Sequence, residues 1–230
     1  MRKGIVILAS VTALMAVVVA VMAFFREPPL GPVYRGKTLS QWLDDRYETP
    51  EGTVVLSDES IAAVQAIGPD AIPHLLQWVS TSESIGKRVW FRFQCASPQL
   101  ACFETDYYEN NSRASHGFRA LGSEAKPAFP KIVDLVLHTN DDHVRCYAIN
   151  SLTEADDDTA KLLITALKHG DLQTRLRAAD ALAAIRISPD IVVPALKDAL
   201  LDPNPAVRAE AASGISLYKT SPRELADTME

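Results

Sequence analysis

One pattern recurs five times along this 230-residue chain: a small residue followed four positions later by an aliphatic one. The pairs are Ala63 with Ile67, Gly117 with Leu121, Ala148 with Leu152, Ala178 with Leu182, and Ala211 with Ile215. Residues four apart share a helix face, so the small side chain lets a neighbouring helix approach while the aliphatic one fills the space between layers. The last three intervals are 31, 30 and 33 residues. A helical period near 30 predicts pairs of helices stacked into a solenoid, because one pair cannot bury its apolar face alone.

Other helical patterns alternate with these five. They are "IPHLLQWVS", "FPKIVDLVLH", "TAKLLITALKHG" and "VVPALKDALLD". Gly68 and Gly122 precede the first two and suit helix C-termini. Upstream, Thr38 followed by Gln41 has the form of a capping box and predicts a short N-terminal helix that covers the first end of the core.

Three of the five registers carry an arginine three residues before the small residue, and an Asp or Asn four residues before that arginine. The pairs are Asp141 with Arg145, Asp171 with Arg175, and Asn204 with Arg208. The Asp or Asn is expected to cap its helix, and the arginine to reach acids along the stack as a structural ladder. The alternative is that these arginines line a groove and hold an acidic peptide or a phosphate.

The segments "VRCYAINSL", "TRLRAADALAAI" and "VRAEAASGI" resemble the second helices of HEAT-like repeats. With "GPDAIP", "GSEAKPAFP" and "YRGKTLSQWL", the chain resembles the bacterial, membrane-anchored, extracytoplasmic HEAT repeat proteins. The expected fold is an all-α, right-handed α-solenoid of about five HEAT-like helical pairs after a transmembrane helix. The expected domains are an anchor at 1–26, a linker and capping helix at 27–57, repeats at 58–220 with an insert at about 81–112, and a tail at 221–230.

Residues 4–25 form an uncharged run of 22 residues after Arg2 and Lys3, long enough to span a bilayer. Basic flanks tend to stay in the cytoplasm, so we expect a signal anchor with the repeats in the periplasm or outside the cell. A signal peptide cleaved near Val21-Met22-Ala23 is the alternative. Residues 27–230 contain all 29 acidic but only 20 of the 23 basic residues, a formal charge of −9 that argues against nucleic acid as a partner.

The insert holds six of the sixteen aromatic side chains, and these are the candidate partner-binding residues: Trp90, Phe91, Phe93, Phe103, Tyr107 and Tyr108. Insertions in repeat proteins lie on one face, which often binds, but the same aromatics could instead pack the insert onto the solenoid. In an oxidising compartment Cys95 and Cys102 could form a disulfide. Cys146 lies among helical apolar positions and is expected to be buried.

No catalytic constellation, cofactor fingerprint or metal site stands out. His138 and His143 could chelate a metal only if a helix turn folded back, and Glu154, Asp156 and Asp158 lack the glycine and final acid of a calcium loop. We therefore expect a non-enzymatic, membrane-tethered scaffold that binds a protein or peptide partner. The alternatives are an enzyme or enzyme subunit, since HEAT-like repeats occur in bilin lyases, and a purely structural envelope component.

Overall fold

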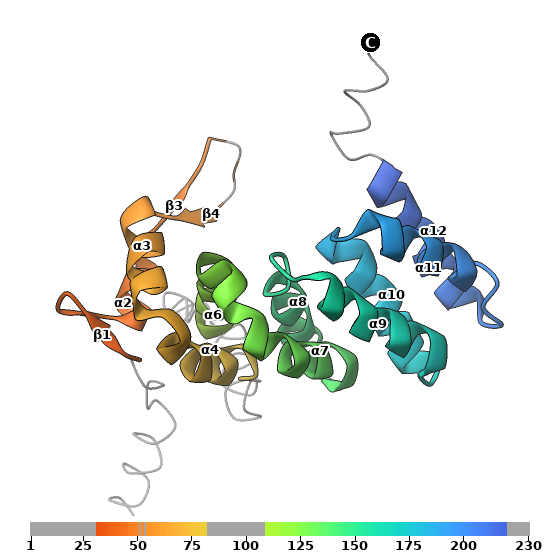
Figure 1. The fold of residues 1–230 in the computed structure, drawn as a ribbon, viewed down its shortest axis with the longest axis horizontal. Coiled ribbons are helices and arrows are strands. Elements are labelled where there is room, and N and C mark those ends of the chain that lie inside the picture. The colour runs from red at the N-terminus through yellow and green to blue at the C-terminus, as the bar shows by residue number, and fades with distance from the viewer. Residues whose placement is uncertain (1–30, 51, 53, 82–108, 220–230) are drawn as a thin grey trace, which may run out of the picture. The chain divides into compact units, whose positions relative to one another are not determined.

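The computed structural model describes residues 31–50, 52, 54–81 and 109–219 (Figure 1). Several predictions therefore lie outside the described residues. These are the anchor at 4–25, the six aromatic candidates Trp90, Phe91, Phe93, Phe103, Tyr107 and Tyr108, the Cys95–Cys102 disulfide, and the tail at 221–230. Within the described part, no helix is both long and apolar enough to cross a membrane.

Two small antiparallel hairpins enclose the N-terminal helix. Strand β1 (Val33–Tyr34) pairs with β2 (Lys37–Thr38), helix α2 (Leu39–Asp44) follows, and β3 (Arg46–Glu48) pairs with β4 (Val54–Leu56). The sequence predicted α2 but neither hairpin, because strands of two or three residues are too short for an alternating pattern to appear. The range 27–57 is thus more than a linker and one helix.

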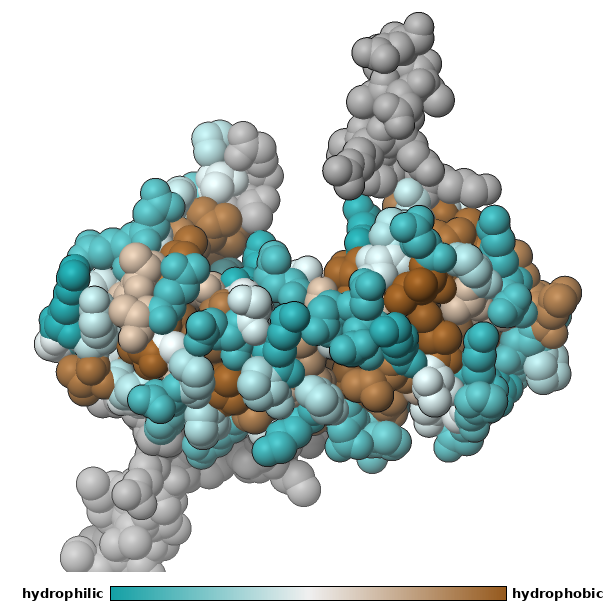
Figure 2. Space-filling view, viewed as in Figure 1, coloured by the Kyte–Doolittle hydropathy of each residue, from teal (hydrophilic) through white to brown (hydrophobic). Residues whose placement is uncertain are grey.

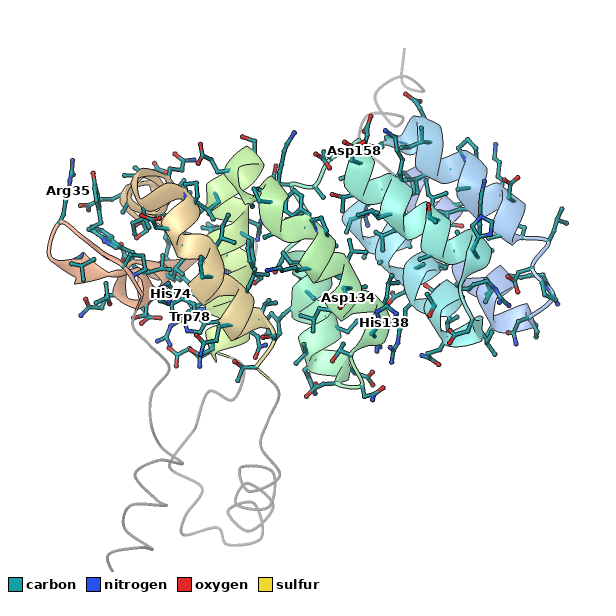
Figure 3. The ribbon with its side chains drawn as sticks, turned by 60° about the horizontal axis from the view of Figure 1, so that its bottom comes forward. Arg35, His74, Trp78, Asp134, His138 and Asp158 are labelled. Carbon is teal, nitrogen blue, oxygen red and sulfur yellow. The ribbon has the colours of Figure 1, made fainter. Side chains whose placement is uncertain are left out.

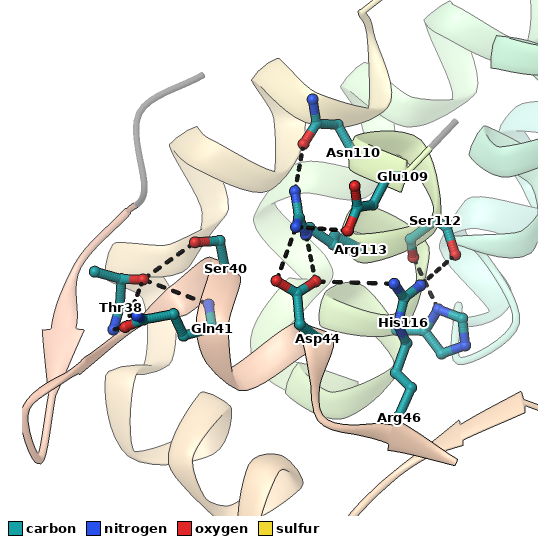
Figure 4. A network of polar contacts seen from close by, with 10 residues as sticks. All are labelled: Thr38, Ser40, Gln41, Asp44, Arg46, Glu109, Asn110, Ser112, Arg113 and His116. Atoms are coloured by element: carbon teal, nitrogen blue, oxygen red, sulfur yellow. Dashed lines mark hydrogen bonds and ion pairs between the residues drawn. The ribbon is translucent and has the colours of Figure 1, made fainter. Parts of the chain in front are cut away.

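The capping box of α2 is confirmed (Figure 4). The Thr38 amide donates to Gln41 Oε1 at 2.8 Å, and the Gln41 amide donates to Thr38 Oγ1 at 3.4 Å. The indole Nε1 of Trp42 donates to the carbonyl of Tyr34 at 3.1 Å, which holds the first hairpin against the helix.

The remaining helices form two rows. One row consists of α4 (Ile72–Val79), α7 (Phe129–His138), α9 (Asp157–His169) and α11 (Pro189–Ala199). The other consists of α3 (Asp58–Ile67), α6 (Glu109–Leu121), α8 (Asp142–Asn150), α10 (Leu172–Ile185) and α12 (Pro205–Lys219). Contacts pair α4 with α6, α7 with α8, α9 with α10, and α11 with α12, and neighbours along the second row also touch. This is the alternation of helices that the repeat predicts (Figure 1).

The five small–aliphatic pairs fall on or just after the helices of the second row, and all but Ile67 are buried. Most of them belong to one hydrophobic core that extends from Leu39 to Tyr218. Gly68 and Gly122 end α3 and α6 at φ 62° and 56°, in the left-handed region that glycine adopts without steric cost. The packing role inferred for the repeat is therefore confirmed.

Two sequence expectations need correction. Cys146 is exposed, not buried, because it lies half a turn away from Val144 and Ala148, which form the buried face of α8. Helix α6 begins at Glu109, so the last four residues of the predicted insert at 81–112 belong to this helix. Asn111, one of these four, is buried.

Candidate functional site

A pocket of about 230 Å³ opens where the second hairpin meets the first helices of the array. Val55 and Leu56 of β4, Ile61 of α3 and Ala120 of α6 form its apolar lining. Its polar lining comes from Gln65 on α3, His116 and Arg119 on α6, and Glu154 in the turn between α8 and α9. Segments almost 100 residues apart in the sequence therefore build one pocket.

A polar network holds the hairpin and α2 against α6 (Figure 4). Arg113 on α6 donates from Nε and Nη2 to the two carboxylate oxygens of Asp44 at 2.6 and 2.8 Å, and from Nη2 to Glu109 at 2.7 Å. Arg46 on β3 donates to Ser112 Oγ on α6 at 2.9 Å. The two-pronged geometry of an arginine on a carboxylate fixes orientation as well as distance, so the pocket wall is preorganised.

The same end of the hairpin is also fixed to α3. The hydroxyls of Ser57 and Ser60 donate to Asp45 Oδ2 at 2.7 and 3.2 Å. These hydrogen bonds lower the pKa of Asp45, because they stabilise its ionised form. Ser57 also caps α3 by accepting from the Ser60 amide, so the start of α3 and the end of the hairpin share one set of bonds.

His116 joins α6 to the hairpin at the pocket wall. Its Nδ1 lies 2.8 Å from the carbonyl oxygen of Ser112, and its Nε2 lies 3.3 Å from that of Val54. Both partners are acceptors, so a neutral imidazole can donate to only one of them, whereas the imidazolium donates to both. Both ring nitrogens therefore face backbone carbonyl oxygens, one on α6 and one on β4.

The rim of the pocket has polar groups that face solvent. Arg119, Gln65 and Glu154 are exposed, and among the described residues no carboxylate pairs with Arg119. The turn that carries Glu154 is fixed by Asp156, which caps α9 and lies 3.3 Å from Lys126 Nζ. Burial acts to raise the pKa of Asp156, but hydrogen bonds from Thr159 and Lys126 outweigh it and lower that pKa.

The size of the pocket limits what it can hold. Sites for drug-sized ligands and cofactors usually enclose roughly 300–1,000 Å³. A volume of about 230 Å³ with an apolar floor instead fits one apolar side chain. Arg119 at the rim can then donate to an acceptor oxygen beside that side chain.

Two further hollows lie between helices of the first row, one between α4 and α7 and one between α9 and α11. On the face drawn in Figure 2, apolar side chains form separate patches among polar ones. The first is lined by Gln77 and Ser80 beside Lys131 and Asp134, and the second by Lys168 beside Asp198 and Asp202. Each hollow draws on two neighbouring helices and the residues at their ends, whereas the hairpin pocket draws on a strand, two helices and a turn. The hairpin pocket is therefore the stronger candidate.

The three predicted ladder arginines share a sequence register but have different partners. Arg145 pairs with Asp142 of its own helix at 2.7 Å. Arg175 pairs with Asp202 of the next repeat at 2.8 Å and donates to the carbonyl of Gly170.

Within the described part of the chain, Arg208 donates to backbone carbonyls of the preceding turn, those of Asp202 and Pro203. The side chains of Asp141, Asp171 and Asn204 accept amide hydrogen bonds at the starts of α8, α10 and α12. Among the described residues, these contacts of the three arginines all lie within the helical array, and none of the three lines the hairpin pocket.

The other polar positions considered in the sequence lie on helices or in the turns between them. His138 and Asp134 lie together on α7, with 3.0 Å between Nδ1 and Oδ1 (Figure 3). Asp158 pairs with Lys161 at 2.8 Å. Within the described residues, no group of three His, Cys, Asp or Glu side chains is placed to hold a metal ion.

The sequence did not reveal the pocket. His116 and Arg119 belong to no recognisable motif. The contact between Asp44 and Arg113 spans 69 residues, so no local spacing could have predicted it. One available signal was the "ENNSRASHGFR" stretch itself, which is unusually polar for a helix that packs between two neighbours.

Residues 129–216 match the family model of HEAT repeats. This range extends from the start of α7 into α12 and includes all three arginine registers. No curated protein matches the chain. The match and the helical architecture together support HEAT-like repeats over residues 129–216.

Proposed function

We propose that this protein is a non-enzymatic scaffold that binds a protein partner, with the hairpin pocket as an anchoring site for one apolar side chain of that partner. HEAT repeats generally mediate protein–protein interaction, since stacked helices present extended binding surfaces. The observation that carries the proposal is a preorganised pocket of single-side-chain size on such an array. At its rim lies the guanidinium of Arg119, which pairs with no carboxylate among the described residues.

The proposal includes the location of the scaffold. Residues 4–25 tether it to a membrane, and the repeats lie outside the cytoplasm. The uncharged run of 22 residues and its basic flank support this arrangement. The formal charge of −9 after the anchor supports a partner other than nucleic acid or an anionic lipid surface.

The placement of both ring nitrogens of His116 against backbone carbonyl oxygens supports a binding role over a catalytic one. A general base needs a free nitrogen within reach of its substrate. Here the imidazole connects α6 to β4. A turnover activity abolished by His116→Gln in a variant that remains folded would contradict the proposal.

The test is quantitative capture of partners from detergent-solubilised membranes by the full chain. Arg119→Ala removes the rim cation, and Gln65→Trp places a large side chain over the pocket from an exposed position on α3. We expect each variant to lose the specific partner by about tenfold, the size of a modest interface hot spot. Unchanged capture by both variants would exclude the pocket as the binding site.

Matched controls separate the pocket from general surface effects. Lys197→Ala removes an exposed cation from the last turn of α11, as Arg119→Ala does from the last turn of α6. Gln173→Trp repeats the change of Gln65→Trp at an exposed position on α10. Both controls should retain the partner.

A further inference from the structure

The rim of the hairpin pocket carries one charge of each sign. Arg119 lies in the last turn of α6 and Glu154 in the turn between α8 and α9, and both are exposed. Among the described residues neither belongs to an ion pair, and Lys126, which reaches this turn, pairs with Asp156 at 3.3 Å. The apolar cavity of about 230 Å³ is thus bordered by a cation and an anion that a ligand can contact.

The first residue of a polypeptide carries three groups on one carbon atom that match this border: an ammonium group, a side chain and a carbonyl group. An apolar side chain can enter between Leu56, Ile61 and Ala120. The ammonium group then lies at the rim, where it can donate to Glu154, and the carbonyl oxygen can accept from Arg119. A residue inside a chain has no such cation to offer Glu154.

The charge around Glu154 favours an amino terminus over a carboxyl terminus. Residues 154–158 read "EADDD" and contain four acids. Lys126 pairs with Asp156, and Lys161 pairs with Asp158 at 2.8 Å. Two basic side chains against four acids leave the turn with a net negative charge, which attracts an ammonium group and repels a carboxylate.

The outer edge of β4 can bind the main chain that follows this first residue. The amide of Ser57 donates to the carbonyl of Asp45 at 3.2 Å, next to the paired residues of β3 and β4. Hydrogen-bonded and non-hydrogen-bonded pairs alternate in an antiparallel ladder, so Val54 and Leu56 direct their backbone groups away from β3. His116 Nε2 lies 3.3 Å from the Val54 carbonyl, so this edge borders the pocket.

Two amides on this edge are suitable donors for an added strand. Among the described residues, the amides of Val54 and Leu56 make no backbone hydrogen bond outside the hairpin. They stand at alternate positions, which is the spacing at which a neighbouring strand pairs. Exposed ion pairs alone add little affinity, so these main-chain bonds favour a polypeptide over a free amino acid as the ligand.

We propose that the hairpin pocket recognises the free amino terminus of a partner protein whose first residue is apolar. The first side chain fills the cavity, the ammonium group binds Glu154, and the first carbonyl oxygen accepts from Arg119. The next residues pair with the outer edge of β4. This inference rests on the proposed function and specifies which part of the partner enters the pocket.

Surface plasmon resonance with the immobilised full chain in detergent tests this recognition. Three hexapeptides of equal composition serve as probes at up to millimolar concentration. The first begins with leucine and has a free amine, the second is the same peptide acetylated at that amine, and the third has its leucine at the fourth position. We expect the first peptide to bind about fivefold more tightly than either of the others, as one ion pair at an exposed rim allows.

A variant of the rim acid tests the assigned contact. Glu154→Gln should reduce the difference between the free and the acetylated peptide to less than twofold, because the amide has no charge to offer the ammonium group. Glu124→Gln makes the same change at an exposed acid in the turn before α7 that does not line the pocket. This control should keep the fivefold difference.

Several outcomes overturn the inference. These are equal binding of the free and acetylated peptides, a preference that Glu154→Gln retains in full, and no binding of any peptide. Tighter binding of an acetylated peptide that ends in leucine with a free carboxylate would assign Arg119 to a carboxyl terminus. Free leucine that binds as tightly as the first peptide would exclude the role of β4. Partner capture by Arg119→Ala and Gln65→Trp tests the proposed function separately, because both variants alter the pocket whichever part of the partner enters it.

Discussion

Arg145 and Arg175 occupy the same position in consecutive repeats, but their replacement should have very different effects on stability. Arg175 donates from Nε and Nη2 to both carboxylate oxygens of Asp202, at 2.8 and 3.2 Å, and the two side chains are 20% and 9% exposed. Arg145 contacts Asp142, which is 81% exposed. We therefore compare Arg175→Met with Arg145→Met, since methionine keeps most of the apolar stem.

The magnitudes follow from solvent access. Arg175→Met leaves the mostly buried carboxylate of Asp202 without its charged partner and should lower the free energy of unfolding by about 2 kcal/mol. Arg145→Met removes a surface ion pair and should cost less than about 0.5 kcal/mol. The assay is urea unfolding of the full chain followed by circular dichroism at pH 7. Equal shifts of the two unfolding midpoints would refute the reasoning.

Two further measurements test the cause. Arg175→Met combined with Asp202→Asn removes the stranded charge while the amide oxygen still accepts from Asn204, so this double variant should recover part of the loss. Hydrogen bonds from Arg175 hold the pKa of Asp202 below its ordinary value of 3.8. The pair therefore stabilises the fold above about pH 4, and the gap between wild type and Arg175→Met should close as the pH falls through the folded pKa of Asp202. A gap that persists in full below that pKa would point to packing instead of charge.

Three more predictions rest on single positions. Burial, and then the charge of Asp180, raise the pKa of Glu210, so ionised Glu210 costs stability. Glu210→Gln should raise the urea midpoint at pH 7 and leave it unchanged below pH 4, where the acid is protonated in both states. Because Cys146 is exposed, it should react rapidly with a thiol reagent in the native state. Cys146→Ser should remove this rapid reaction. A Cβ on Gly117 would lie 2.5 Å from Leu75 Cδ2, so Gly117→Val should lower the free energy of unfolding by about 1–3 kcal/mol in thermal unfolding. Ala62→Val, at an exposed position on α3, should cost much less.

The predictable part of the fold is the part that repeats. Helix faces, caps and C-terminal glycines depend on neighbours within four residues, so Asp171 could be assigned as a cap and Gly68 as a terminus from spacing alone. The small–aliphatic pattern also predicted which helix face is buried, because every repeat packs that face against its neighbours. The prediction for Cys146 was wrong because it relied on the apolar residues nearby and did not determine that the face of α8 with Val144 is the buried one.

The hairpin pocket was not predictable in this way. Its walls come from β4, α3, α6 and the α8–α9 turn, and the contact that orients them joins Asp44 to Arg113. The Asp44–Arg113 pair occurs once, so the sequence offers no repeated spacing from which this contact could be recognised. The hairpins themselves are too short to produce an alternating pattern.

The arginine ladder shows where periodicity stops giving information. Arg175 finds Asp202 in the turn 27 residues later, but the same offset from Arg145 falls on Leu172, so Arg145 pairs with Asp142 of its own helix. Arg175 and Arg208 share instead a bond to the carbonyl five residues before them. The common role of these two is therefore to hold the turn that enters their own helix. A link to the next repeat forms only where that repeat's turn supplies an acid, which means that the coupling between repeats is set by the turns and varies along the stack.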